Sequence, residues 1–301
     1  MTNPQQPKVG LYIDPLTDFG FKKLFGTEPN KDLLIALLNS IFRGRKNIVD
    51  LTYNKNEHHG ETKDEGAAIF DLTCTGDDGE RFIIEVQRGK QGNFKQRAVF
   101  YTSRLITEQA PKGRRSEWAY DVKEVYLIAL LEDFTLDAMG DGRYLHDICL
   151  SERETGKVFY DGLGYIFIEL VNFVKTEDEA ETDLERWLYV LKNMSSMDKV
   201  SIYTRKPIFE KLFNVAEYAN LTKEEKAMYD ASLKRKWDNK AVLDYAVSEA
   251  VKEATTKTRE EERAKAEAEK LKSALKMKQS GFDVYMIADI LELPVEKVEK
   301  L

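Results

Sequence analysis

The chain has 301 residues, of which 42% are hydrophobic and 33% charged, and its formal net charge is −7. Its two cysteines lie far apart and its three histidines match no HExxH pattern, which argues against a disulfide scaffold and against a zinc hydrolase. The polar N-terminus has no apolar signal core, and no apolar run approaches the ~20 residues that span a bilayer. We therefore expect a cytoplasmic protein with no membrane partner.

The order of the predicted elements indicates an α/β fold. Apolar residues at helical spacing, β-branched runs and turn residues predict a short helix or turn over 18–25 and helices over 30–42 and 94–109. They predict strands over 47–53, 67–75, 81–87, 122–131, 144–150 and 165–173. Helix, strand, strand, strand, helix and strand in the first part of the chain predict an α/β sandwich with a mixed sheet. After about residue 175 the sequence is predicted to be helical.

A hairpin is predicted where residues 76–79, Gly-Asp-Asp-Gly, separate two strands. A type I turn at the two aspartates, followed by Gly79 at positive φ, would place Asp71 directly opposite Glu85. Gln87 falls on the same face as Glu85, because side chains alternate along a strand. The opposite face carries the apolar residues Phe70, Leu72, Phe82, Ile84 and Val86. A slip of one residue would bury both acids in the core, so this register is favoured.

Two carboxylates opposed on a strand pair repel each other, and a divalent cation would offset that repulsion. Mg²⁺ prefers such oxygen ligands; it lowers the pKa of a bound water and stabilises charge on a phosphate. Gln87 could orient that water, although it supplies no positive charge. The alternative interpretation of Asp71 and Glu85 is an acidic strand surface that faces solvent.

The charge is unevenly distributed along the chain. Residues 88–115 contain eight basic residues and one glutamate, so this segment carries +7 and the remainder carries −14. A local positive field of this kind can attract a polyanion in spite of the negative total. The alternative is a solvated helix face.

Four stretches carry a resemblance to a known family: 14–25 (DPLTDFGFKKLF), the hairpin with 70–72 (FDL) and 84–87 (IEVQ), 97–104 (RAVFYTSR), and 125–130 (VYLIAL). Together they resemble the PD-(D/E)XK nuclease superfamily, and within it the Rpn-type recombination-promoting nucleases, which are also described as transposases. The resemblance covers roughly the first half of the chain. It implies a restriction-endonuclease-like core, a mixed sheet flanked by helices, ahead of an all-helical C-terminal region.

The resemblance also implies an activity and a site. It implies an endonuclease that uses Mg²⁺ or another divalent cation to hydrolyse DNA phosphodiesters, in recombination, mobile elements or phage defence. Asp71 and Glu85 would be the metal ligands, together with the backbone carbonyl of Val86. Asp18 would supply a further carboxylate, unless it is an N-cap or turn residue. Gln87 stands where the superfamily has lysine.

On the predicted helix 94–109, Arg97, Tyr101 and Arg104 share one face. Next to the implied site, Arg97 and Arg104 would hold DNA phosphates, and Tyr101 would either contact DNA or pack in the core. Because Gln87 replaces the lysine, a catalytically weak DNA-binding or scaffold protein is the alternative function. An RNA-directed nuclease is a third.

The sequence suggests three regions: a nuclease-like domain over 8–175, a helical region over 176–270 and a small helix-turn-helix-like cap over 271–301. A weak heptad seam occupies positions 243, 247, 250, 254, 257, 261, 264, 268, 271 and 275. It predicts either a homodimer through the C-terminal helices or a long exposed helix. In the cap, residues 287, 290, 291, 293 and 298 are predicted to form a small apolar core.

Overall fold

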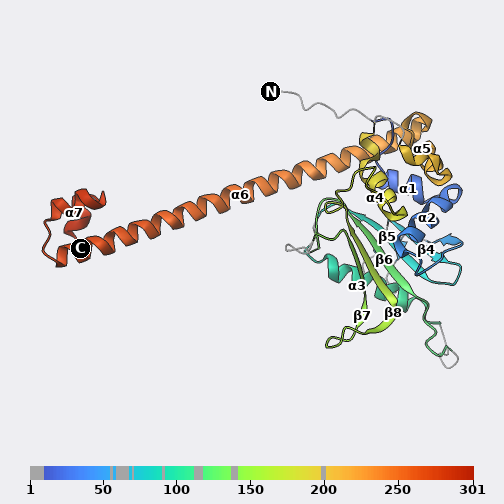
Figure 1. The fold of residues 1–301 in the computed structure, drawn as a ribbon, viewed down its shortest axis with the longest axis horizontal. Helices are drawn as coiled ribbons and strands as arrows, with labels where there is room; N and C mark the ends of the chain where they lie inside the picture. Colours follow the sequence, from blue (N-terminus) through green and yellow to red (C-terminus); the bar gives the residue numbers. More distant parts are fainter. Residues whose placement is uncertain are drawn as a thin grey trace. The chain divides into compact units, whose positions relative to one another are not determined.

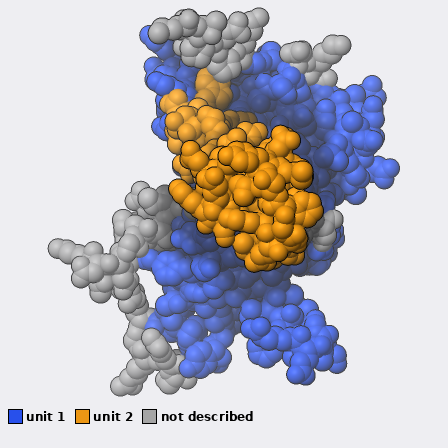
Figure 2. Space-filling view, turned by 90° about the vertical axis from the view of Figure 1, so that its left-hand side faces the viewer, with its two compact units in different colours: residues 1–236 blue, residues 237–301 orange. Residues whose placement is uncertain are grey.

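The computed structural model describes residues 10–54, 57–58, 68–69, 71–89, 92–111, 118–136, 142–197 and 201–301. The chain forms two compact units, residues 1–236 and residues 237–301 (Figure 2). The boundaries that the sequence suggests near residues 175 and 270 stay predictions.

A six-stranded mixed sheet forms the centre of the first unit. Its strand order is β1-β4-β5-β6-β8-β7, with β1 at Leu51–Tyr53, β4 at Leu72–Gly76, β5 at Arg81–Gln87, β6 at Val125–Leu131, β7 at Leu145–Ser151 and β8 at Val158–Glu169. Strands β5, β6 and β8 are parallel, whereas β1, β4 and β7 pair antiparallel with their neighbours. The mixed sheet predicted from the sequence is confirmed.

Helices cover both faces of this sheet (Figure 1). On one face, Phe42 of α2 packs against the rings of Phe82 and Tyr126, at centroid distances of 5.9 and 5.0 Å. On the other face, Phe94 and other apolar residues of α3 pack with Ile83 in one buried cluster. The α-helices that lie wholly within this unit are α1 (Asp18–Phe25), α2 (Lys31–Phe42), α3 (Phe94–Thr107), α4 (Asp183–Asn193) and α5 (Pro207–Ala216). Short 3-10 helices lie at Glu28–Asn30, Met194–Ser196, Ile202–Arg205 and Tyr218–Asn220.

Several strands differ from the prediction; β1, for example, begins at Leu51 and not at residue 47. The strand predicted over 67–75 is divided, because β3 (Ala68–Ile69) pairs with β2 (Glu57–His58) in a separate two-stranded ladder and β4 begins only at Leu72. Strand β8 begins at Val158, earlier than predicted. Its Gly164 lies under the ring of Tyr126, and a Cβ there would come within 2.6 Å of Tyr126 Cδ1. Glycine, which lowers strand propensity, is therefore required at this point of the strand.

The C-terminal region is helical, as predicted. Helix α6 spans Lys223–Gln279 and is followed by α7 (Val284–Leu291) and α8 (Val295–Glu299). Ile287 and Val298 are fully buried in the apolar core of the cap. The prediction for Ile290 was wrong, since its side chain is 57% exposed. Within the described ranges, no helix is long and apolar enough to cross a membrane.

Candidate active site

The hairpin of β4 and β5 has the register that its turn predicts. Leu72 pairs with Ile84 and Thr75 with Arg81, and Gly79 has a φ of +88°. The ladder ends at Leu72, so Asp71 lies one residue beyond it, beside Glu85 and Val86. The local turn chemistry therefore brings the two predicted carboxylates to the same end of the hairpin.

The Asp71 side chain accepts a backbone hydrogen bond at this end of the ladder. Its Oδ2 accepts from the backbone N–H of Val86 at 2.8 Å. Burial raises the pKa of the Asp71 carboxyl and the Asp18 carboxylate acts in the same direction, whereas the Val86 N–H and the charges of Lys22 and Arg88 oppose the rise. The carboxyl thus lies in a partly desolvated position with charged groups from α1 close by.

Glu85 is the most strongly perturbed acid of the hairpin. Its residue is 3% exposed. Burial raises the pKa of its carboxyl from 4.5 to about 7, and Asp71 adds to the rise, although Arg97 and Gln87 oppose it. The alternative interpretation, an acidic surface that faces solvent, is therefore wrong for Glu85, because α3 covers this face of the sheet. A buried carboxyl poised near neutrality is typical of functional sites.

Gln87 and Arg97 both approach the same oxygen of Glu85. The Nε2 of Gln87 donates to Glu85 Oε2 at 2.8 Å, and Nη2 of Arg97 lies 3.7 Å from that oxygen. The guanidinium of Arg97 lies 5.6 Å from the ring centroids of Phe94 and Tyr101. The sequence placed Arg97 beside the site, and the structure places it directly against the buried acid.

Arg104 lies near the other end of strand β5. Its side chain is 14% exposed and lies 4.0 Å from Glu108, which is also 3.8 Å from Arg81. Arg81 precedes Glu85 by four strand residues, a separation of about 13 Å. Among the other basic residues of 88–115, Lys90, Lys112, Arg114 and Arg115 lie outside the described residues.

Asp18 is the first residue of α1. The N-cap is Thr17, whose side chain accepts from the N–H of Gly20. The Asp18 carboxylate pairs with Lys22 at 2.8 Å, and the two side chains are 49% and 44% exposed. In this structure Asp18 is thus engaged with a lysine at the rim of the site.

A second network of charges borders Gln87, and sequence reasoning missed it. Lys236 of α6 forms ion pairs with Asp14, at 2.7 Å, and with Glu132. Glu132 follows β6, and its N–H donates to the carbonyl of Gln87 at 2.8 Å. Arg88 donates to the carbonyl of Leu16 at 2.7 Å and lies 3.6 Å from Glu132. Because Lys236 is 222 residues from Asp14 in the chain, no local pattern could have revealed this contact.

A protein-family model described as "PD-(D/E)XK nuclease family transposase" matches residues 15–246. The match covers far more than half of the chain. The chain belongs to this family. Comparisons with curated proteins and with solved structures give no significant match. The six-stranded mixed sheet flanked by helices agrees with the restriction-endonuclease-like core that the sequence resemblance implied.

The donor set of the hairpin fits the divalent cations that PD-(D/E)XK nucleases use. Asp71 and Glu85 offer hard carboxylate oxygens, and a cation would relieve the repulsion that contributes to the raised pKa of Glu85. Within the described ranges, no three His, Cys, Asp or Glu side chains already form a metal-ready group. Two carboxylates with a backbone carbonyl and water are sufficient for Mg²⁺, which usually keeps several of its waters.

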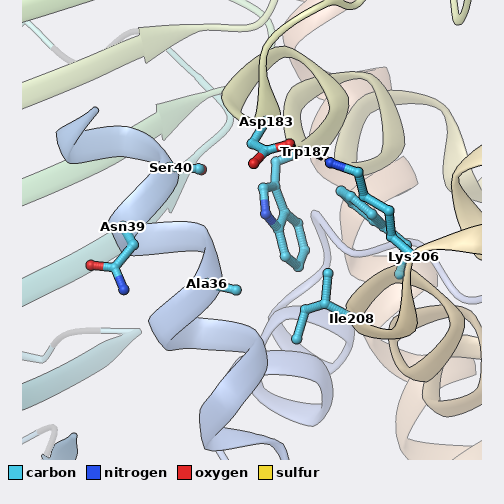
Figure 3. Close-up of a pocket in the computed structure, with 8 residues that line it drawn as sticks. Ala36, Asn39, Ser40, Asp183, Trp187, Lys206 and Ile208 are labelled. Carbon is cyan, nitrogen blue, oxygen red and sulfur yellow. Dashed lines mark hydrogen bonds and ion pairs between the residues drawn. The ribbon is translucent and has the colours of Figure 1, made fainter. Parts of the chain in front are cut away.

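A cavity of about 330 Å³ lies between α2, α4 and the start of α5, away from Asp71, Glu85 and Gln87 (Figure 3). Its lining includes Trp187 and Ile208, and Asp183 forms an ion pair with Lys206 at 2.7 Å on its border. None of the hairpin residues lines it. The cavity therefore takes no part in the candidate active site.

Proposed function

We propose that this chain is a divalent-metal-dependent DNA endonuclease whose chemistry takes place at Asp71, Glu85 and Gln87. The observation that carries the proposal is the position of Asp71 at the end of the hairpin ladder, hydrogen-bonded to Val86, beside a buried Glu85 whose pKa is raised to about 7. Membership in a nuclease family supports the reaction class. The family description as a transposase supports a role in recombination or mobile elements. Phage defence is proposed on the sequence resemblance alone.

Each site residue has a proposed role. Asp71, Glu85 and the backbone carbonyl of Val86 would hold Mg²⁺ or another divalent cation. Asp18 is a further candidate ligand, because it is close enough for its negative charge to raise the pKa of Asp71. The bound cation would supply an acidified water and stabilise charge on the phosphate. Gln87 would hold the attacking water in line with the phosphorus.

In the proposed reaction, the oxygen of a water molecule forms a bond to phosphorus and one ester P–O bond breaks. The water loses a proton, and the departing sugar oxygen gains one. Arg97, on α3 beside Glu85, would contact a phosphate near the cleaved bond, whereas Arg104 would contact the backbone further along. DNA is thus the proposed partner, and a homodimer through the C-terminal helices stays a proposal.

One observation favours the alternative of a catalytically weak DNA-binding or scaffold protein. Position 87 carries an uncharged amide, and that amide already donates to Glu85. The site therefore has no lysine at the position where the superfamily has one. Metal-dependent cleavage of DNA separates the two functions, because a scaffold would bind DNA without cutting it.

The test compares Asp71→Ala with Asp78→Ala, a matched control at the exposed turn of the same hairpin. We expect the parent and Asp78→Ala to nick supercoiled plasmid with Mg²⁺ and not with EDTA. Asp71→Ala should stay folded, lose cleavage and bind Mg²⁺ more weakly in titration calorimetry. Equal cleavage by Asp71→Ala and the parent would show that the site assignment is wrong. A parent that binds DNA but never cuts it would favour the scaffold.

A further inference from the structure

The proposed site has few cations that could neutralise a cleaved phosphate. Among the described residues near the hairpin, Arg88 is held by the carbonyl of Leu16 and lies beside Glu132. Lys236 is shared between two carboxylates. Arg97 lies against Glu85. Gln87 is neutral, so a positive charge in addition to that of Arg97 would come from another element, and α1 carries Lys22.

Helix α1 lies beside the site, because the residues that flank it on both sides contact the hairpin or the residue that follows it. At its start, Leu16 accepts the hydrogen bond from Arg88, the residue after Gln87. At its end, a Cβ on Gly26 would come within 2.7 Å of Leu72, the residue after Asp71. The eight residues of α1, which lie between these two contacts, span about 12 Å. One face of α1 is therefore held next to Asp71.

Lys22 projects from this part of α1. Its carbonyl accepts from the N–H of Gly26 at 2.8 Å, so it lies one turn before the contact with Leu72. Its ammonium pairs with Asp18, and the charges of both residues are felt at Asp71. The Lys22 side chain is 44% exposed, which leaves it accessible to a ligand that enters the site from solvent.

From this placement we propose that Lys22 contacts the phosphate undergoing cleavage and supplies the positive charge that Gln87 lacks. Asp18 holds the ammonium at the rim until DNA binds. Phosphate then competes with one exposed carboxylate, and an exposed pair of this kind is weak enough to exchange. This inference rests on the proposed nuclease function, which it refines by naming a further substrate-contacting residue.

The first experiment measures single-turnover nicking by Lys22→Ala, with Lys31→Ala as the matched control. Lys31 also forms an ion pair, with the exposed Asp50, but that pair lies next to Leu51, whose partner is Gly76 at the far end of β4. We expect Lys22→Ala to be slowed about 10²-fold, as when one donor to a transition-state oxyanion is removed. Lys31→Ala should be unchanged. Adding Gln87→Lys to Lys22→Ala should restore most of the rate, because the new lysine replaces the lost charge. If Lys22→Ala had only damaged the structure, Gln87→Lys would not restore the rate.

The second experiment does not depend on cleavage. Binding of a fluorescent 20-base-pair duplex is measured in Ca²⁺ at several salt concentrations. Loss of one phosphate contact should flatten the slope of log K against log salt by about 0.9 for Lys22→Ala, and not for Lys31→Ala. An unchanged slope together with an unchanged nicking rate would overturn the inference. If the parent cuts no DNA, the proposed function fails, and the salt slope alone decides whether Lys22 contacts phosphate.

Discussion

Replacing Glu85 by glutamine should change how the stability of the protein depends on pH. The pKa of this buried carboxyl is raised from 4.5 to about 7, chiefly by burial. Such a rise corresponds to roughly 3 kcal/mol of unfolding free energy, because the folded state holds the proton more tightly than the unfolded state does. This contribution to the free energy of unfolding is fully present below pH 4.5, falls as the pH rises towards 7 and is absent above it.

Glutamine keeps the shape of the side chain and has no proton to lose. The free energy of unfolding should be measured by urea denaturation between pH 4.5 and 8.5 in EDTA, for the parent and for Glu85→Gln. The difference between the two proteins isolates the titration of Glu85 from that of all other groups. We expect the parent to lose roughly 3 kcal/mol relative to Glu85→Gln across this range.

Arg97 does not alter this expectation. Its guanidinium stays charged over the whole range, and its attraction to the ionised Glu85 carboxylate is already contained in the pKa of about 7. With Mg²⁺ the parent should regain stability above pH 7, because the cation binds the deprotonated carboxylate. A difference between parent and variant that is independent of pH would refute the claim that burial by α3 perturbs Glu85.

Two further predictions concern DNA and assembly. Arg97→Glu should weaken cleavage more than Arg104→Glu does, because Arg97 lies 3.7 Å from Glu85 and Arg104 lies beside Glu108; equal effects in plasmid nicking would contradict this ranking. Deleting residues 271–301 should change the oligomeric state in light scattering more than the nicking rate, since the exposed acids Glu296 and Glu299 at α8 suit a DNA-reading helix poorly. Sequence-selective binding by the isolated fragment 271–301, selected from random duplexes, would disprove that assignment.

The hairpin was predictable because its determinants are local. The turn residues 76–79 fix the register, and the apolar alternation of β5 opposes any slip by one residue. Asp71, Glu85 and Gln87 could thus be grouped without knowledge of the rest of the fold. The boundaries of β8 were less predictable, because Gly164 is required by contact with Tyr126 on a neighbouring strand.

The environment of the site depends on contacts that are distant in sequence. The alternation of β5 indicated one apolar face and one acidic face, but it could not show that α3 covers the acidic face and buries Glu85. Nor could it show that Lys236 joins Asp14 and Glu132 beside Gln87. These contacts decide the pKa values and the arrangement of charges, so sequence reasoning could group Asp71, Glu85 and Gln87 but could not predict their electrostatics.

The burial of Glu85 connects the stability of this fold to its proposed chemistry. A glutamine at this position would avoid the cost of desolvating a carboxylate. A sequence optimised for folding stability alone would therefore not carry an acid here. The acid is nevertheless held under α3, with Arg97 and Gln87 directed at one of its oxygens. These contacts fix its orientation but leave its pKa near 7, so a divalent cation bound at the proposed site would displace its proton at neutral pH. Burial destabilises the deprotonated carboxylate of Glu85 in the folded protein, and glutamine would remove this cost. The proposed metal would offset the same cost, but only in the folded site.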